Sequence, residues 1–286
     1  MSYLLAIDVG TQSARAIVFD LHGNIVDKAQ VHNAPYESPQ PGWAEQDPDL
    51  YWRAIIQACQ ALWIQGKVSA NQIAGLSMTT QRATVVCVDK HNQALRPAIV
   101  WMDQRRELSP PPISWYWKLA LSAVGMKNTL EYFATQAEVN WLKANQPDIW
   151  AKTEKFIFLS GYLTHKLTGE FVDSIGSQVG YIPFDYKRLT WEESWDVKWQ
   201  VAPVEPHKLP HLVAPSEQMG TLSASAAQAL GLTQGLPVIA AAADKACEVL
   251  GAGCTRNDQA CLSFGTSATI NVTHSKYVEP QKFVPP

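Results

Sequence analysis

The sequence predicts an α/β fold in which a mixed β-sheet is flanked by helices. Near the N-terminus, apolar segments of strand length are joined by a tight turn, as in an antiparallel hairpin. Further along the chain, such segments are separated by long stretches with the apolar spacing of helices, which is typical of helical crossovers. Strands that are connected in both ways indicate a mixed sheet.

Three consecutive strands are predicted at the N-terminus. Residues 3–8 and 14–20 are apolar runs, and the segment "DLHGN" (20–24) is a hairpin turn in which Gly23 can adopt a positive φ. Residues 25–32 predict the third strand. Together the three strands form an antiparallel meander.

An irregular segment and a helix follow the meander. Residues 35–48, "PYESPQPGWAEQDP", predict an excursion without a chemical role that ends at Asp47, an N-cap residue before Pro48. The apolar side chains of the next segment lie on one face of a helix, which ends before Gly66. They are Tyr51, Ile55, Cys59 and Leu62.

The remainder of this region alternates between strands and helices. Residues 73–79, "IAGLSMT", predict a buried strand, and residues 82–101 predict a second hairpin-like passage. Residues 115–170 are predicted to be mostly helical. A last buried strand is predicted over residues 236–244, ending on Asp244. A helical segment follows it.

The organisation restarts near residues 254–258. Residues 259–274, "QACLSFGTSATINVTH", repeat the strand, hydroxyl-rich turn and strand of the N-terminal segment "LLAIDVGTQSARAIVF". We therefore expect a complete domain over residues 1–254 and the opening strands of a truncated second domain over residues 255–286. A lone hairpin is marginal in water, so we expect it to dock on its own domain, to pair with a second copy as a homodimer, or to fray.

Composition excludes several classes of function. The net charge of −3 provides no basic field for nucleic acid or for an anionic membrane. No stretch approaches the roughly 20 apolar residues that span a bilayer, and no signal peptide is expected. The five cysteines show no CxxC spacing, which predicts reduced, buried thiols in a cytoplasmic protein.

The turn over residues 10–13 has the composition of a phosphate-binding loop. Glycine, threonine and serine present backbone N–H groups and hydroxyls at close range, and residues 265–267 offer a second such turn. The alternative is that both turns are simple hairpin connections. Asp8, a carboxylate inside an apolar run, is either a magnesium ligand or the acceptor of a structural hydrogen bond.

Five ordered blocks of sequence carry a family resemblance. They are "IDVGTQSARAIVFD", "PGWAEQDP", "TTQRATVV…LRPAIVWMDQRR", "WLKANQPD…YLTHKLTGEFVDS" and "AAADKACEVLGAG". In this order they resemble the FGGY carbohydrate kinases. The resemblance implies a ribonuclease H-like fold of the actin, Hsp70 and hexokinase superfamily, with two domains around a cleft. It also implies ATP-dependent transfer of a phosphoryl group to an alcohol acceptor, with Mg²⁺. The glycine-rich adenosine motif of that family is absent from the sequence.

The resemblance also implies roles for individual residues. Asp244 matches the catalytic base, although an aspartate there is also explained as a helix N-cap, and Asp8 matches the metal ligand. The nucleotide-phosphate residues are Asp8, Gly10, Thr11, Gln12, Ser13, Arg15, Gly265, Thr266 and Ser267. The acceptor residues are Gln81, Arg82, Trp101, Asp103, Asp244 and Lys245.

Several alternatives stay open at this point. Arg82 could pair with Asp103 while Trp101 only packs, in place of contacting the acceptor. Ala83 and Lys245 depart from the glycerol-kinase pattern, so the acceptor could be a ketose such as a pentulose or a polyol such as glycerol. A nucleotide-driven switch protein and a non-catalytic sugar-binding regulator are the competing functions. We expect the 286-residue chain to be inactive alone.

Overall fold

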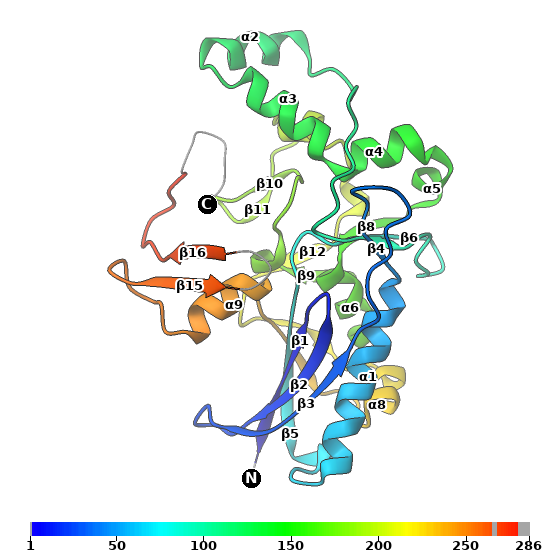
Figure 1. Ribbon diagram of the computed structural model, residues 1–286, viewed down its shortest axis with the longest axis vertical. Helices are drawn as coiled ribbons and strands as arrows, with labels where there is room; N and C mark the ends of the chain where they lie inside the picture. Colours follow the sequence, from blue (N-terminus) through cyan, green and yellow to red (C-terminus); the bar gives the residue numbers. More distant parts are fainter. Residues whose placement is uncertain (1, 265–267, 280–286) are drawn as a thin grey trace.

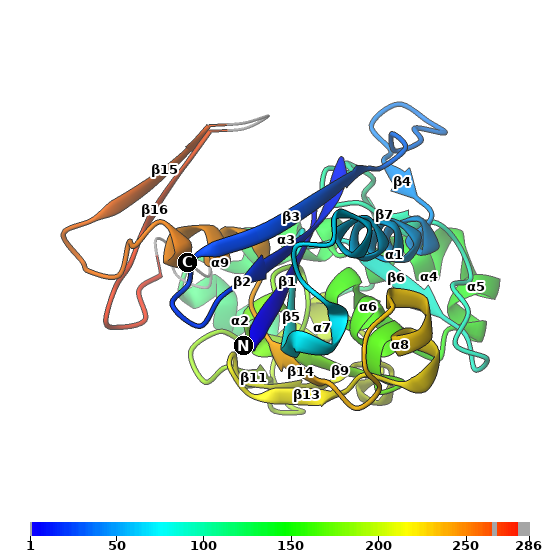
Figure 2. The same cartoon turned by 90° about the horizontal axis from the view of Figure 1, so that it is seen from below.

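The computed structural model describes residues 2–264 and 268–279. At its centre lies a six-stranded mixed sheet with the order β13-β14-β5-β1-β2-β3, of which Figure 1 labels β1, β2, β3 and β5 and Figure 2 also labels β13 and β14. β1, β5 and β14 are parallel to one another, whereas β2, β3 and β13 run antiparallel to their neighbours. The bounds are β1 (Tyr3–Val9), β2 (Ser13–Phe19), β3 (Ile25–His32), β5 (Ile73–Thr80), β13 (Gln218–Thr221) and β14 (Pro237–Ala240). The predicted α/β class and mixed sheet are confirmed.

The predicted meander is confirmed almost residue for residue. Leu5, Ile7 and Val9 alternate along β1 and are buried, as the spacing of a strand with one core face requires. Gly23 adopts the expected positive φ of 84° in the turn between β2 and β3. The antiparallel register places Asp8 opposite Arg15.

Three helices cover one face of this sheet: α1 (Pro48–Gln65), α6 (Leu159–Thr168) and α8 (Ala224–Leu230) (Figure 2). The Asp47 carboxylate caps α1 by accepting the N–H of Asp49 at 3.0 Å, and Gly66 ends the helix with a left-handed φ of 72°. The four apolar residues predicted to share one face of α1 are all buried. Burial of this apolar stripe against β2 and β3 holds the helix on the sheet.

A second, antiparallel sheet has the order β4-β7-β6-β8. Its strands are β4 (Glu45–Gln46), β7 (Ala98–Ile99), β6 (Val85–Val88) and β8 (Lys155–Phe158). The hairpin-like passage over residues 82–101 thus joins this second sheet, not the central one. The predicted helical region forms α2 (Trp115–Ala123), α3 (Lys127–Gln136), α4 (Glu138–Asn145) and α5 (Pro147–Lys152), followed by β8 and α6. In Figure 1, α2 and α3 project at the end of the molecule opposite to the N-terminus.

Shorter elements complete the domain. They are β9 (Val172–Ser174), which pairs in parallel with β12 (His211–Val213), the antiparallel pair β10 (Phe184–Asp185) and β11 (Thr190–Trp191), helix α7 (Lys198–Val201), and the 3₁₀ turns Ala70–Gln72, Ile175–Ser177 and Pro206–Lys208. All five cysteines are free thiols. Among the residues described, no helix combines the length and the apolar character needed to cross a membrane.

One predicted strand end is wrong. β14 ends at Ala240, and Asp244 is the first residue of α9 (Asp244–Gly251), with Ala243 as its N-cap. Asp244 therefore neither ends the strand nor caps the helix. The three intervening residues, Ala241, Ala242 and Ala243, carry it beyond the sheet edge.

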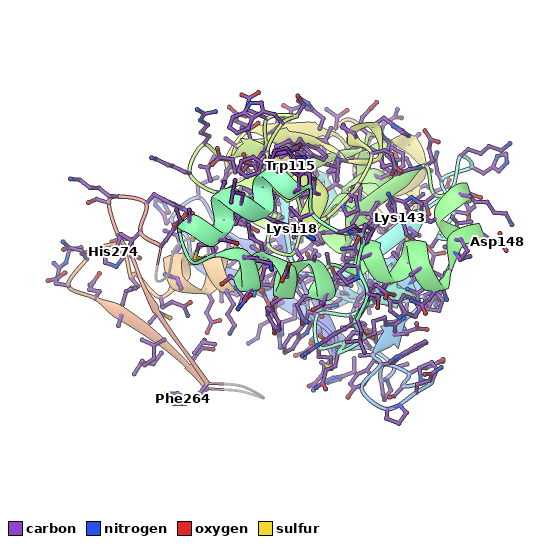
Figure 3. All side chains as sticks on the ribbon, turned by 90° about the horizontal axis from the view of Figure 1, so that it is seen from above. Trp115, Lys118, Lys143, Asp148, Phe264 and His274 are labelled. Carbon is purple, nitrogen blue, oxygen red and sulfur yellow. The ribbon has the colours of Figure 1, made fainter. Side chains whose placement is uncertain are left out.

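The C-terminal hairpin forms a separate sheet of β15 (Ala260–Phe264) and β16 (Ala268–Val272). It docks on its own domain through the Lys245 ammonium, 2.9 Å from the Ser263 hydroxyl, and through the Thr273 hydroxyl, which donates to the Cys254 carbonyl at 2.6 Å. Its outward face is apolar and exposed, and Phe264 lies at the outer end of β15 (Figure 3). The division into domains at residues 254 and 255 stays a prediction.

Candidate functional site

The candidate site lies where three parallel strands of the central sheet end. The chain leaves the carboxyl ends of β1, β5 and β14 at one edge, because these strands are parallel neighbours. Loops at this edge of an α/β sheet are the common place for ligands. They carry Thr11 after β1, Arg82 after β5 and Asp244 after β14.

Asp8 and Arg15 form an ion pair across β1 and β2. The Arg15 Nη1 lies 2.6 Å from the Asp8 Oδ2, and the two side chains are 46% and 31% exposed. At this exposure the pair contributes little to stability, about 1 kcal/mol at most. Because the ion pair is weak, Asp8 and Arg15 can separate and each can bind a ligand at the sheet edge instead.

The loop between β1 and β2 presents free backbone donors. The Gly10 N–H is used, because it donates to the Ser13 carbonyl at 2.9 Å, and Asn33 holds the loop by donating to the carbonyls of Gly10 and Gln12. In the part of the chain that the structure describes, the backbone N–H groups of Thr11 and Gln12 have no hydrogen-bond partner. Such neighbouring donors suit the oxygens of a phosphate. The second predicted phosphate turn, Gly265, Thr266 and Ser267, lies outside the described residues.

Asp244 is held in place by the segment that precedes it. The carbonyls of Ala241 and Ala242 accept hydrogen bonds from the hydroxyls of Ser174 at 2.5 Å and Thr79 at 2.7 Å. The Ala243 N–H donates to the Gly176 carbonyl at 3.0 Å. A side chain at Gly176 would collide with Ala242, since a Cβ there would lie 2.7 Å from the Cβ of Ala242. These contacts fix the segment between β14 and α9.

The charge environment of Asp244 suits a proton acceptor. Burial raises the pKa of its carboxyl, while the Lys245 N–H, which donates to Oδ1 at 2.8 Å, and the charge of Arg82 act in the opposite direction. The negative charge of Asp8 adds to the increase in pKa. A carboxylate with a raised pKa is a better base near neutral pH than an ordinary aspartate.

Two carboxylates at one edge also suit magnesium. Mg²⁺ is usually bound by one or two carboxylates together with phosphate oxygens and water, not by a cage of protein ligands. Within residues 2–264 and 268–279, no three or more His, Cys, Asp or Glu residues gather as a metal cluster. Asp8 and Asp244 therefore match a metal that arrives with a phosphorylated ligand.

Arg82 and Trp101 face solvent at this site. Among the described residues, the Arg82 guanidinium makes no ion pair or hydrogen bond, and the side chain is exposed. Its neighbour Ala83 has a φ of 53°, which a non-glycine residue rarely adopts. Trp101 follows β7, is 44% exposed, and donates its indole N–H to the Thr11 hydroxyl at 3.1 Å.

Asp103 and Gln81 are placed differently from the other predicted acceptor residues. The Asp103 carboxylate pairs with Arg105, not with Arg82, at 2.6 Å, and it also accepts the Ala44 N–H at 2.6 Å. The Gln81 side chain is buried and hydrogen-bonded within the protein. The alternative in which Arg82 pairs with Asp103 is thus wrong.

Lys245 points toward the C-terminal hairpin. Its ammonium lies 2.7 Å from the Glu248 carboxylate as well as 2.9 Å from the Ser263 hydroxyl. A cavity of about 460 Å³ opens between α9 and β16. Its lining includes Arg82, Gly176, Lys245, Asn271 and Thr273. Arg82 therefore borders this cavity on one side and the carboxyl edge of the sheet on the other.

The predicted excursion over residues 35–48 supports the site, although the sequence showed no chemical role for it. Glu45 forms ion pairs with Arg96 and Arg105, and the Arg105 guanidinium lies over the ring of Trp43 at 4.1 Å. This buried cluster fixes the loop that carries Trp101. The one feature of the sequence that could have indicated this cluster is the density of charged and aromatic residues in the segments 43–47 and 96–106.

The chain is similar to carbohydrate kinases along most of its length. The profile of the "FGGY family of carbohydrate kinases, N-terminal domain" matches residues 3–251. A xylulose kinase of Lactococcus lactis is 27% identical over 281 residues, which are 98% of this chain and 55% of that protein. A glycerol kinase of Thermococcus gammatolerans is 33% identical over 196 residues, which are 67% of this chain and 39% of that protein.

Solved structures agree with the fold. The ligand-bound xylulose kinase from Lactobacillus acidophilus matches with a TM-score of 0.80 at 20% identity, over 98% of this chain and 56% of that one. This match confirms the predicted ribonuclease H-like fold. The chain spans about half the length of the curated relatives it matches.

Proposed function

Because the chain belongs to the FGGY family of carbohydrate kinases, we propose that it carries the acceptor-binding and phosphate-binding wall of a sugar or polyol kinase. One observation supports this proposal above the others. Asp8, Arg82 and Asp244, which are far apart in sequence, meet at the carboxyl edge of three parallel strands. This edge carries a carboxylate of raised pKa, together with a guanidinium and backbone N–H groups that have no partner among the described residues, which matches what phosphoryl transfer needs.

Asp244 is the general base in this proposal. It accepts the proton of the attacking acceptor hydroxyl as the new oxygen–phosphorus bond forms and the bond between the phosphoryl group and ADP breaks. ATP would supply the transferable phosphoryl group, and Mg²⁺ would neutralise its charge. Asp8 would hold the metal, and the N–H groups of Thr11 and Gln12 would bind phosphate oxygens.

Arg82 and Trp101 orient the acceptor in this proposal. The Arg82 guanidinium can donate to two vicinal hydroxyls at once, since none of its donors is used within the described chain. The Trp101 ring offers an apolar face to the carbon skeleton. Arg15 would add positive charge beside the phosphate, released from Asp8 once the metal binds there.

The class of acceptor follows from the relatives. Those named above are xylulose and glycerol kinases, so we propose a ketose such as a pentulose, or a polyol such as glycerol. Ala83 and Lys245, which both depart from the glycerol-kinase pattern, weigh against a site built for glycerol. A cytoplasmic location fits this metabolic role.

A panel assay tests the proposed function. ADP release by the full-length protein is measured with ATP and Mg²⁺. Glycerol, other polyols, ketopentoses and ketohexoses are added one at a time as acceptors. We expect release that depends on one class of acceptor. Release of ADP at the same rate with and without every acceptor would instead support a nucleotide-driven switch, and acceptor binding without release would support a regulator.

A further inference from the structure

A row of hydrogen bonds, exposed at Trp101 and buried from Gln81 inward, runs from the phosphate loop into the protein. The Trp101 indole N–H donates to the Thr11 hydroxyl, and the Thr11 hydroxyl donates to the Gln81 side-chain oxygen. The Gln81 amide donates to the Tyr51 hydroxyl at 2.8 Å. The Tyr51 hydroxyl in turn donates to the Gln46 side-chain oxygen.

The row ends on the backbone. The Gln46 amide donates to the Ala34 carbonyl at 2.7 Å. Gln46 belongs to β4 of the second sheet, whereas Thr11 and Gln81 directly follow β1 and β5 of the central sheet. The row therefore connects the two sheets behind the candidate site.

The chemistry of both ends sets the direction of every donor. The Ala34 carbonyl can only accept, so Gln46 must present its amide nitrogen there and its oxygen to Tyr51. The Tyr51 proton then goes to Gln46, so Gln81 must present its amide nitrogen to Tyr51 and its oxygen to the Thr11 hydroxyl, which donates to it. At the other end, the Trp101 indole can only donate, and the Thr11 oxygen is able to accept from it. The row has one consistent arrangement.

Burial makes this arrangement costly to break. Gln46 and Gln81 are each 3% exposed, and Tyr51 is fully buried. Burial also raises the pKa of Tyr51, which keeps its hydroxyl protonated and able to donate. A buried amide or hydroxyl that loses its partner cannot turn to water in its place. On its inner side, the Thr11 hydroxyl is thus held by buried groups that water does not replace.

We propose that Gln46, Tyr51 and Gln81 are positioning residues, which act through the Thr11 hydroxyl to hold the Trp101 ring at the acceptor side of the site. This inference rests on the proposed function, because it takes Trp101 as an acceptor contact. It also assigns Thr11 two separate tasks. Its backbone N–H is available to bind phosphate. Its hydroxyl donates a hydrogen bond to Gln81 and accepts one from the Trp101 indole.

The indole N–H of Trp101 reports on this row directly, with no need for activity. Its NMR signal and its hydrogen-exchange rate are measured in the 286-residue chain, with Trp101→Phe to assign the signal. Thr11→Val should raise the exchange rate about fivefold, as expected for loss of one neutral hydrogen bond. Thr11→Ser should keep the parent rate. Tyr51→Phe, which does not touch Trp101, should shift the signal and raise the rate about twofold.

The matched control is Thr221→Val on the edge strand β13, which should leave the Trp101 signal unchanged. An unchanged signal in Tyr51→Phe, with the folded protein confirmed by circular dichroism, would overturn the proposed role of the buried residues. An unchanged signal in Thr11→Val would overturn the contact itself.

Acceptor affinity provides the second readout. Calorimetry with xylulose and glycerol should show a dissociation constant about fivefold higher in Thr11→Val and unchanged in Thr11→Ser, while the affinity for ADP changes less than twofold. Equal acceptor affinity in Thr11→Val and the parent would overturn the positioning role. If the indole signal responds but neither acceptor binds the parent chain, the row of hydrogen bonds is supported and the proposed function is contradicted.

Discussion

Asp173 supports the candidate site and makes the stability of the protein depend on pH. Its carboxylate is 1% exposed and accepts hydrogen bonds from the Ser160 hydroxyl at 2.7 Å and the Gln178 amide at 2.8 Å. The adjacent Ser174 holds the Ala241 carbonyl, and thereby the segment before Asp244. Burial raises the pKa of Asp173 to about 6, against the opposing effect of these hydrogen bonds.

The sign and size of the effect follow from this pKa. In the unfolded chain an aspartate loses its proton near pH 3.9, about two units below the folded value. Between these values the folded state binds more protons than the unfolded state, so the free energy of unfolding falls as the pH rises. Two pKa units correspond to about 3 kcal/mol, which is present below pH 4 and lost above about pH 6.

The variant Asp173→Asn removes this titration. An asparagine keeps an oxygen for the Ser174 N–H, but its amide meets the Gln178 amide donor to donor, which costs about 1 kcal/mol at every pH. The parent should therefore exceed the variant in stability by about 1 kcal/mol at pH 4. By pH 7 the parent should have lost about 3 kcal/mol, so the variant should then be the more stable protein by about 2 kcal/mol.

Urea unfolding at pH 4, 5, 6 and 7, followed by tryptophan fluorescence, measures the difference between the two proteins. The matched control is Asp148→Asn on α5, an exposed carboxylate (Figure 3), whose difference from the parent should change little with pH. A difference between parent and Asp173→Asn that stays flat from pH 4 to pH 7 would refute the reasoning.

Three further predictions concern the site and the chain. Arg82→Ala should weaken acceptor binding about tenfold in calorimetry, because a charge-assisted hydrogen bond is lost, whereas Arg188→Ala at an exposed position should leave acceptor binding unchanged. A raised dissociation constant for ADP alone would place Arg82 on the phosphate side of the site. The 286-residue chain should bind acceptor but release no ADP, because it spans about half the length of the kinases it matches and closure of a site needs both of its sides. Turnover at the rate of an intact kinase would contradict this. Among the thiols, half-buried Cys247 should react with a thiol reagent first, since burial raises the pKa of Cys59 to about 12 and that of Cys87 to about 11; mass spectrometry that finds Cys59 labelled earliest would refute it.

Local patterns predicted the elements that depend on local chemistry. The alternation of apolar residues is enough to identify β1 and β2, because one face of each strand is buried. β3 buries only Asp27 and Ala29, and the hairpin turn before it predicts it instead. The start and end of α1 were also predictable from local sequence. Asp47 caps a first-turn N–H group of the helix, Pro48 occupies its first position and Gly66 adopts the left-handed conformation that ends it. These signals do not depend on the rest of the chain.

The end of β14 could not be predicted in this way. The run of alanines before Asp244 follows an apolar segment of strand length, yet alanine has the highest helix propensity, so the local signals conflict and contacts from distant residues decide its conformation. Thr79, Ser174 and Gly176 provide those contacts. None of them is adjacent to the alanines in sequence.

The candidate site shows the same division. The family resemblance implied roles for Arg82, Trp101 and Asp244. The structure places these residues near one edge of the sheet, and their roles stay predictions. The burial of Gln81 was not predictable, because its partners Thr11 and Tyr51 lie 70 and 30 residues away along the chain. The sequence around a polar residue next to a strand does not distinguish a side chain that faces a cleft from one that is hydrogen-bonded to a buried partner.

Turnover of Asp244→Asn tests the central claim most directly. Acceptor-dependent ADP release is measured on the protein as the cell makes it, with Asp148→Asn as the control. We predict that kcat falls about 10²–10⁴-fold with little change in acceptor KM, as expected for loss of a general base. The parent rate should also decline as the pH falls through the pKa of Asp244, which burial raises. Equal kcat values in Asp244→Asn and the parent would contradict the account.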